Sequence, residues 1–395
     1  MKVLMVGPLP KDVGGTYTTG ICKVAYELSR QKYDKVELYL SSTNIHQRKA
    51  VKISTYQNQY NGFRWLIFDI IVDLLFHPLQ TARELKYYKE RCHVNPWRYE
   101  FYKVNIRRHI KRIKPDIIHV HSTGCPAVYF ANKPHVPTID TMHGVFYRGQ
   151  AGQEKLGDFL RACVEQCDYF TGLTKECETL MKKHFGIPDS KLTIIPNGVN
   201  TSLYFFDKDQ RSVLRKKQNV GQAVVFITVA SVQERKGQMK FIKVLQNLNI
   251  DYRYWILGDG PDKQKVIEYC RETGISDKIT CFGNIKSEEL FKYYSAADIY
   301  AHASTMEGQA LCEMEAYATG IRIIVNQDIK DTIATDIDNK EIYYKLDFDN
   351  IDTEDLMEWI KDEIPNRQSR NDMSWAVIAD KYEMLYKKIY NKILK

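Results

Sequence analysis

The sequence lacks an uninterrupted apolar run long enough to cross a bilayer. Its longest apolar stretch, residues 63–76, contains Arg64, Asp69 and Asp73 and is shorter than the ~20 residues of a transmembrane helix. Paired C-x2-C motifs are also absent among the nine cysteines, so no metal site is expected. Residues 1–7 read as a first buried strand, because no signal-peptide cleavage site follows them. We therefore expect a cytoplasmic protein with reduced thiols.

Two nucleotide-binding fingerprints are missing as well. Neither G-x-G-x-x-G nor G-x4-G-K-[ST] occurs, which argues against a nicotinamide-dependent oxidoreductase and a P-loop ATPase. D-x-D, a motif that can bind a divalent metal at a strand end, occurs three times in letters, at residues 207–209, 336–338 and 347–349. All three lie in acidic, loop-like stretches where this spacing arises by chance. A metal-dependent enzyme that uses one of these matches stays open as an alternative, and loss of activity in EDTA would support it.

What the sequence does contain is an alternation of strand-like and helix-like segments over 395 residues, 44% of them apolar. Such alternation predicts an α/β fold with mostly parallel sheets. We expect two Rossmann-like, doubly wound domains facing a cleft. The N-terminal domain would span residues 1–198 with a helical insert at about 44–95, and the C-terminal domain residues 199–372. A helix in residues 373–395 would pack back on the N-terminal domain. Strands are expected at residues 3–6, 36–40, 117–120, 138–142, 169–173, 192–195, 223–229, 253–257, 279–282, 299–301 and 322–325.

Charge is concentrated in the first half of the chain. The whole chain carries a formal net charge of +8, yet residues 83–114 alone hold 11 basic and 3 acidic side chains. Such a segment favours an anionic partner. Residues 99–113 show helical spacing, with an apolar face for a core and a positive face outside. Upstream, Trp65, Phe68 and Leu74 could dock at a membrane interface, although plain packing explains them equally well. No nucleic-acid-binding motif is present, and no nucleic-acid partner is expected.

Several candidate ligand contacts follow predicted strands. Gly14, Gly15 and Thr16 follow the first strand, where glycines let a backbone approach a phosphate. Residues 231–237, Ser-Val-Gln-Glu-Arg-Lys-Gly, follow the first strand of the second domain. There Lys236 could balance a diphosphate. The alternative is a surface charge at a helix start. Gly258 belongs to a tight turn after the next strand.

The most specific pattern runs from Glu307 to Ala316. Glu307 is expected in a loop, and Glu315 about one turn into the following helix. The helix N-terminus between them presents backbone N–H groups suited to a pyrophosphate. One carboxylate could accept ribose hydroxyls and the other a sugar hydroxyl. A capped amphipathic helix with acidic residues in its first turns is the alternative.

Histidines end two strands of the first domain. His119 and His121 lie on the same side of one strand because side chains alternate, and His143 follows another. A terminal His121 would face the predicted cleft. His121 and His143 could bind sugar hydroxyls or transfer protons.

Taken together, these residues resemble the retaining GT-B glycosyltransferases of glycosyltransferase family 4. The resemblance spans nearly the whole chain and is most specific at residues 307–320, which match the family's E-x7-E signature. The family implies a nucleotide-sugar donor bound mainly by the C-terminal domain. Glu315 would then hold the ribose and Glu307 the donor sugar, with Lys236 and His121 also catalytic. The diphosphate would meet Gly15, Lys236 and the backbone amides of Gln309, Ala310 and Leu311. The other donor contacts would be Thr16, His143, Ser231, Arg235, Gly258, Asn284, Ile285 and Gly308, with the base near 284–285.

Two positions depart from the family pattern. Ser231 stands five residues before Lys236, where the family has an arginine. Arg235 could supply the charge, but its neighbour Lys236 implies that it points elsewhere. Gln309 and Ala310 replace the last two residues of the usual E-G-F-G, which changes the lining of the sugar pocket.

The resemblance implies transfer of a hexosyl or N-acetylhexosaminyl group with retention of configuration. The donor would be a UDP-sugar, with no metal or cofactor, and the acceptor a glycan or a lipid-linked molecule. The expected setting is bacterial cell-surface polysaccharide synthesis at the inner face of the plasma membrane, with peripheral association with anionic lipid. One alternative is a metal-dependent GT-A glycosyltransferase, which would need one of the D-x-D matches at a strand end. The other, motivated by Ser231, is a non-catalytic nucleotide-sugar-binding subunit that regulates a partner glycosyltransferase.

Overall fold

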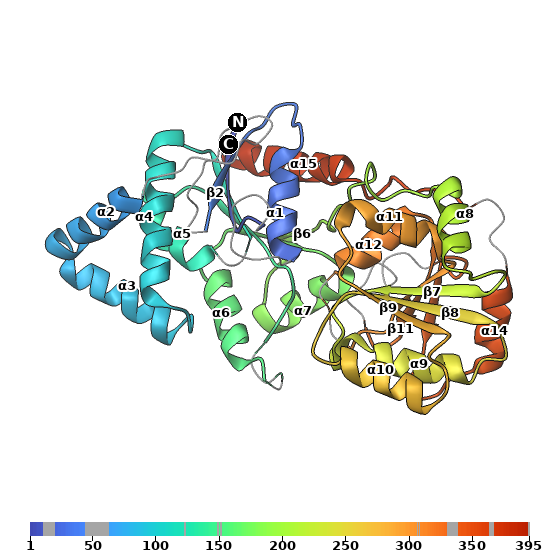
Figure 1. The fold of residues 1–395 in the computed structure, drawn as a ribbon. Coiled ribbons are helices and arrows are strands. Elements are labelled where there is room, and N and C mark those ends of the chain that lie inside the picture. Colours follow the sequence, from blue (N-terminus) through green and yellow to red (C-terminus); the bar gives the residue numbers. More distant parts are fainter. Residues whose placement is uncertain are drawn as a thin grey trace. The chain divides into compact units, whose positions relative to one another are not determined.

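The computed structural model describes residues 1–10, 20–43, 63–121, 124–147, 150, 152–305, 307, 309–329, 339–362 and 367–393. The chain divides into two compact units: unit 1 holds residues 1–197 and 375–395, and unit 2 holds residues 198–374. Each contains a six-stranded parallel sheet (Figure 1). These two parallel sheets with their surrounding helices agree with the predicted pair of Rossmann-like domains.

The sheet of unit 1 has the order β2-β1-β3-β4-β5-β6. Its strands are β1 (Lys2–Gly7), β2 (Glu37–Ser42), β3 (Ile117–Val120), β4 (Thr138–Thr141), β5 (Tyr169–Gly172) and β6 (Leu192–Ile194). Its helices are α1 (Gly20–Arg30), α2 (Phe63–Phe76), α3 (Pro78–Glu90), α4 (Pro96–Ile113), α5 (Cys125–Ala131), α6 (Glu154–Val164), α7 (Lys175–Phe185) and α15 (Trp375–Ile393). The order reverses between β1 and β3, so the first sheet is doubly wound.

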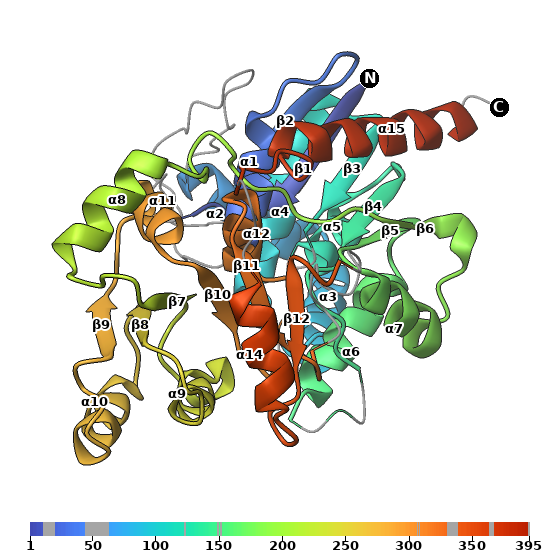
Figure 2. The ribbon, with the colours of Figure 1, turned by 90° about the vertical axis from the view of Figure 1, so that its right-hand side faces the viewer.

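Helix α15 lies across the first sheet (Figure 2). Its Tyr386 hydroxyl lies 2.6 Å from Nδ1 of His119 on β3. Glu383 of the same helix accepts hydrogen bonds from the backbone N–H groups of Asp34 and Lys35 at 2.9 and 3.0 Å. The last helix is thus part of unit 1, although it follows unit 2 in the chain.

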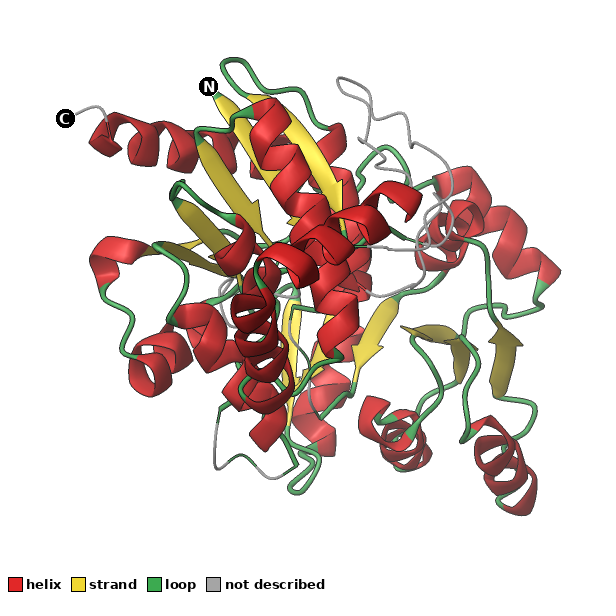
Figure 3. Cartoon of the chain, turned by 90° about the vertical axis from the view of Figure 1, so that its left-hand side faces the viewer, coloured by secondary structure: helices red, strands yellow, loops and turns green. Residues whose placement is uncertain are grey.

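Helix α4 packs against the sheet on one side and carries α2 and α3 on the other (Figures 1 and 3). It begins where Asn95 caps the N–H of Arg98 and Pro96 takes the first helical position, as helix starts require. Residues 63–76 and 78–90 of the predicted insert are helical, while residues 44–62 lie outside the described part. The predicted positive face of α4 is only partly correct. Lys103 is buried, and it forms ion pairs with Asp73, Glu84 and Glu100. A buried charge needs such partners.

The sheet of unit 2 has the order β12-β11-β10-β7-β8-β9. Its strands are β7 (Val224–Val229), β8 (Tyr252–Leu257), β9 (Ile279–Gly283), β10 (Ile299–His302), β11 (Arg322–Asn326) and β12 (Tyr343–Leu346). Its helices are α8 (Lys208–Lys217), α9 (Gln238–Gln246), α10 (Lys263–Glu272), α11 (Ser287–Ala296), α12 (Leu311–Ala318) and α14 (Thr353–Lys361). Side chains alternate along each strand, so two cores form.

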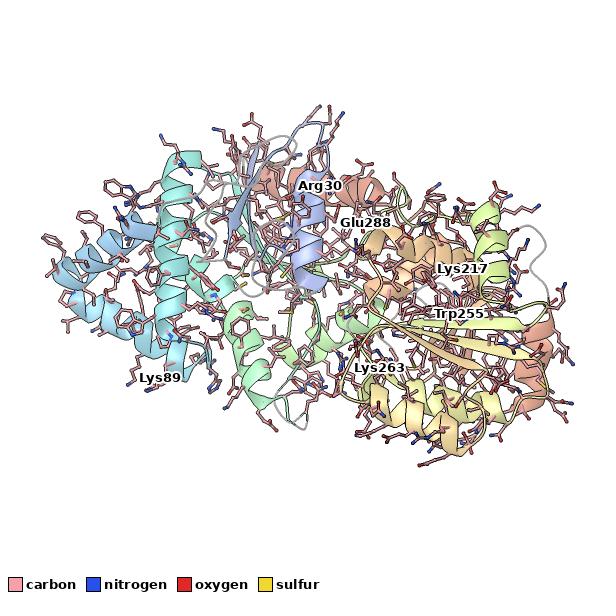
Figure 4. All side chains as sticks on the ribbon, viewed as in Figure 1. Arg30, Lys89, Lys217, Trp255, Lys263 and Glu288 are labelled. Carbon is pink, nitrogen blue, oxygen red and sulfur yellow. The ribbon has the colours of Figure 1, made fainter. Side chains whose placement is uncertain are left out.

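One core of unit 2 receives Val225, Ile227 and Trp255 beneath α8, α11 and α12. The other receives Phe226 and Tyr254 against α9, α10 and α14. Figure 1 shows these helix layers on opposite faces of the sheet, and Figure 4 places Trp255 at the level of the strands. A doubly wound sheet of this kind leaves only its strand ends free for ligands.

Candidate functional site

The strand order of unit 2 reverses at β7. The chain proceeds from β7 to β8 and β9 on one side, and through β10, β11 and β12 on the other. In open α/β sheets the crevice for ligands lies at such a reversal, beyond the carboxyl ends of the strands. The loops that leave β7 and β10 therefore flank the candidate site, and these loops contain Lys236 and Glu307.

The two loops are pressed together at Gly237. After β7 the chain forms a 3-10 turn, Glu234–Lys236, and Gly237 then adopts a φ of 72° before α9. A Cβ atom on Gly237 would lie 2.0 Å from the carbonyl oxygen of Ala303, which follows β10. Only glycine fits this approach without displacing backbone.

Lys236 and Glu307 form an ion pair at this point. The Glu307 Oε1 atom also accepts a hydrogen bond from Ser304 Oγ at 2.7 Å. The backbone N–H of Thr305 donates to the carbonyl oxygen of Arg235 at 2.8 Å, which ties the two loops together a second time. The prediction that Arg235 points elsewhere is wrong, because its guanidinium lies 3.7 Å from the same Glu307 oxygen.

Burial and the neighbouring charges shift the pKa of the Glu307 carboxyl group in opposite directions. Burial raises the pKa of its carboxyl group, but Lys236, His302 and the hydrogen bonds from Lys236 and Ser304 outweigh burial, and the pKa is lowered. Glu307 is therefore an anion at neutral pH. An anionic, partly buried carboxylate can accept hydrogen bonds from sugar hydroxyls.

His302, at the end of β10, was not predicted from the sequence. It is buried, and its Nε2 atom has no hydrogen-bond partner among the residues that the structure describes. Burial lowers the pKa of His302 to about 4, with Glu307 raising it and Lys236 lowering it further. The sequence offered one signal that His302 belongs to the site, namely its position at the carboxyl end of a central strand.

The N-terminus of α12 lies directly after the Glu307 loop. Ala310 is the N-cap residue and offers no side-chain cap. The first N–H groups of a helix have no acceptor within the helix, so those of residues 310–312 can meet an anion. Glu315 lies one turn further and is buried, with Tyr294 Oη 3.4 Å from its Oε2. Burial and the Glu315 charge both raise the pKa of Tyr204, which keeps that phenol protonated beside the carboxylate.

The next two strands contribute backbone to the same edge of the sheet. Gly258 follows β8, and its N–H donates to the carbonyl oxygen of Gly283 at 2.8 Å. Beyond Gly283, Asn284 is exposed and Ile285 packs partly against the core. Ser231 is exposed and lies 2.7 Å from Gln233 Nε2, while Gln309 is buried.

In unit 1, the predicted histidines lie together. His121 Nδ1 is 2.9 Å from His143 Nε2, and the two rings stack. Burial lowers the pKa of both, that of His143 to about 4, so the pair is neutral at pH 7. Neutral imidazoles can donate and accept hydrogen bonds without repelling an anion. Their proximity to the donor site, like the predicted cleft, stays a prediction.

Some predicted contacts fall outside the described residues: Gly15, Thr16 and Gly308. The same holds for the D-x-D match at residues 336–338. The other two matches have local roles. Asp207 caps α8 by accepting from the N–H groups of Asp209 and Gln210, and Asp347 accepts from the N–H groups of Asp349 and Asn350. These two carboxylates therefore have local structural roles, and the GT-A alternative stays untested.

One group of side chains in the described ranges has metal-ligand spacing. The ligand atoms of Cys125, Asp140 and Cys163 lie within 4.8 Å of one another, buried in unit 1. Burial raises the pKa of the Cys163 thiol to about 11, which disfavours the thiolate that a metal would need. The expectation of a metal-free protein stays a prediction.

The pH dependence of stability offers a test of the buried His302. Since its pKa is about 4 in the fold and ~6.5 unfolded, the unfolded chain binds a proton between these pH values that the folded chain does not. Unit 2 should therefore lose stability as pH falls from 6.5 to 4, by about 3 kcal/mol from this group alone. His302→Asn should flatten that fall in urea unfolding, whereas His135→Asn, at an exposed histidine, should leave it unchanged. Equal slopes in all three proteins would contradict a buried neutral His302.

Comparison with known proteins gives matches to two family models and to several relatives. A model described as Glycosyltransferase Family 4 matches residues 75–203, and one described as Glycosyl transferases group 1 matches residues 209–375. The chain is 26% identical over 246 residues to alpha-monoglucosyldiacylglycerol synthase of Acholeplasma laidlawii, covering 56% of this chain and 61% of that protein. It is 25% identical over 178 residues to a GDP-mannose-dependent phosphatidylinositol monomannoside mannosyltransferase of Mycolicibacterium smegmatis, covering 42% and 46%. The alignments thus span less than two thirds of either relative.

Among solved structures, the fold is similar to that of Anabaena Alr3699/HepE in complex with UDP. The TM-score is 0.63 at 14% identity, over 100% of this chain and 98% of that one. At this identity the likeness concerns the fold alone. It extends over both units and so agrees with the predicted GT-B architecture.

Proposed function

Because the chain belongs to glycosyltransferase family 4, we propose that it transfers a sugar from a UDP-sugar to a glycan or lipid-linked acceptor, with retention of configuration. The observation that carries the proposal is the Lys236–Glu307 ion pair, held at the strand-order reversal of unit 2 beside the N-terminus of α12. A cation, a carboxylate and a helix N-terminus at one strand edge suit a sugar diphosphate. The group would be a hexosyl or N-acetylhexosaminyl residue, and the setting bacterial cell-surface polysaccharide synthesis.

Each part of the donor has a matching partner in this assignment. The diphosphate binds Lys236 and the amide groups of residues 309–311, and the ribose hydroxyls bind the buried carboxylate of Glu315. The base lies against the backbone of residues 284–285, which follow β9. Glu307 accepts hydroxyls of the donor sugar. The neutral His121–His143 pair serves the sugar and the acceptor.

The chemistry follows from where charge develops. The bond between the anomeric carbon and the β-phosphate oxygen breaks, and its electron pair stays on that oxygen. Lys236 and the N-terminus of α12 stabilise the growing negative charge without reorganising. The leaving oxygen then takes the proton of the acceptor hydroxyl, whose oxygen bonds the anomeric carbon on the face that the phosphate left. Atoms and charge balance without a metal, so the proposed step needs no divalent cation.

The choice of uracil as base rests on two supports. The family resemblance favours it, and a protein of similar fold was solved with UDP. The M. smegmatis relative is described as GDP-mannose-dependent, so GDP is the competing nucleotide.

Glu315 provides the test of the donor site. Glu315→Gln removes the anionic acceptor for two ribose hydroxyls, and a hydrogen bond to a charged group contributes about 1.5–3 kcal/mol. We expect UDP to raise the melting temperature of the wild type more than GDP or ADP, and the affinity of Glu315→Gln for UDP to fall about 10- to 100-fold in calorimetry.

The matched control is Glu313→Gln, two residues earlier in α12 and therefore on a different side of the helix. It should bind UDP as the wild type does. Preference for GDP would correct the base and leave the site in place. Equal UDP affinity in the wild type and Glu315→Gln would remove Glu315 from the donor site.

A further inference from the structure

Helices α2 and α3 carry a concentration of exposed apolar side chains. Fifteen large apolar side chains are exposed in the described ranges, and eight of them lie on these two helices. We call them the α2–α3 apolar face: Trp65, Ile67, Phe68, Ile71, Leu74, Leu75, Phe76 and Leu79. Leu75, Phe76 and Leu79 are 70–75% exposed at the bend where the helices meet (Figure 1). An apolar patch of this density on a soluble surface marks an interaction site.

The side of α2 that faces α4 is already packed, so the exposed apolar side chains form a second apolar side of the helix. Leu66 and Ile70 are buried against Val104 of α4. Arg108 and Arg107 of α4 pair with Asp69 and Asp73 of α2. Apolar contacts and ion pairs therefore hold the hairpin to α4, with its second apolar side directed outward.

The dimensions of the hairpin suit the surface of a bilayer. No helix in the described part of the chain is long and apolar enough to cross a membrane alone, and α2 and α3 pass that test only as a pair bent by 115°. Helix α2, with 14 residues, is about 21 Å long, against ~30 Å of hydrocarbon. Its Asp69 and Asp73 remain bound to α4, so α2 cannot leave unit 1 without breaking those ion pairs.

The charged side chains of α2 and α3 indicate which kind of surface the apolar face would bind. The exposed charged side chains of α2 and α3 are Arg64, Arg83, Lys86, Lys89 and Glu90. The acids of α2 are paired with arginines of α4, so the charge that α2 and α3 present to solvent is mainly positive. Figure 4 shows Lys89 on α3, near the start of α4. Exposed basic residues on the same helix pair as exposed tryptophan and leucine are a combination that suits anionic lipid interfaces.

We propose that the α2–α3 apolar face docks on an anionic lipid bilayer. The apolar side chains at the bend enter the boundary between headgroups and acyl chains, and the basic side chains bind the anionic headgroups. Neither the proposed donor contacts of unit 2 nor the His121–His143 pair shares a residue with this face, so the proposal stands apart from the proposed sugar transfer. Membrane binding and nucleotide binding can each fail without the other.

Flotation of the full chain with liposomes tests the proposal. One set of vesicles contains phosphatidylcholine alone, and the other contains 30% phosphatidylglycerol. We expect the wild type to float with the anionic vesicles and at least tenfold less with the neutral ones. The triple variant Leu75→Ser/Phe76→Ser/Leu79→Ser should float at least tenfold less than the wild type. UDP binding by calorimetry should be unchanged in it, which also shows that the variant is folded.

The matched control replaces three exposed apolar residues elsewhere, Val213→Ser/Ile267→Ser/Met384→Ser, and should float as the wild type does. Equal flotation of the two triple variants would overturn the proposal, as would a wild type that does not float. Light scattering after gel filtration detects the rival occupant, a second copy of this chain. A wild-type dimer that becomes a monomer in the Leu75/Phe76/Leu79 variant, without flotation, would assign the face to self-association.

Discussion

Replacing Lys236 by alanine should lower kcat about 10²- to 10³-fold, the usual loss when one preorganised group that stabilises transition-state charge is removed. Lys236 is the cation that the structure places at the strand-order reversal of unit 2, against Glu307. Its charge matters most when the diphosphate leaves, so kcat should fall more than KM rises. Release of UDP from the UDP-sugar, measured at saturating donor, gives the comparison.

The structure also explains why Lys236→Ala should remain folded. Glu307 keeps its hydrogen bond from Ser304 and lies 3.7 Å from Arg235, so its carboxylate is not left alone. The same two partners can hold Glu307 when Lys236 turns to a phosphate. The control is Lys240→Ala, at an exposed lysine on α9 in the following turn. A Lys236→Ala variant within threefold of wild-type kcat would remove Lys236 from the chemistry.

The second large effect is expected at Gly237. Alanine there meets both a strained φ of 72° and a carbonyl oxygen 2.0 Å from its Cβ. The backbone strain costs about 1–2 kcal/mol, and relieving the clash must move the β7 loop away from the β10 loop. We expect Gly237→Ala to lower the stability of unit 2 by more than about 3 kcal/mol in urea unfolding. Activity should fall with it, because the Lys236–Glu307 contact depends on that approach.

Gly274 allows the effect of backbone strain to be measured apart from the effect of the steric clash. It follows α10 with nearly the same φ, 71°, yet nothing lies within 4 Å of its Cβ position. Gly274→Ala should therefore show the strain alone, about 1–2 kcal/mol, with normal activity. If both variants lose the same stability, the close approach of the two loops does not exist in solution.

The sequence predicted the repetitive parts of this fold well, because apolar runs and helical spacing are local signals. The strand at residues 117–120 has the bounds expected for it, and the helix at residues 375–393 lies within the expected range of 373–395. Strand β12 was missed because Tyr343–Leu346 includes the exposed Lys345 and lies at the edge of the sheet. An edge strand needs few apolar residues and so leaves a weak pattern.

Individual site residues could be predicted from the sequence, but which of them lie next to one another could not. Lys236 and Glu307 are 71 residues apart, and strand order alone makes their loops neighbours. Arg235 was misplaced because adjacent residues were assumed to diverge, whereas the 3-10 turn before Gly237 directs both side chains toward Glu307. The burial of Lys103 was equally invisible, since its acidic partners come from three separate helices.

The measurement that tests the central claim most directly is UDP release from a panel of UDP-sugars by the wild-type protein in the presence of EDTA. We expect release from at least one donor, unaffected by EDTA and faster with lipid-linked or glycan acceptors, with the sugar's anomeric configuration retained in the product. Tight UDP binding without release, with every donor and acceptor tried, would contradict catalysis and favour a subunit that binds nucleotide-sugars to regulate a partner.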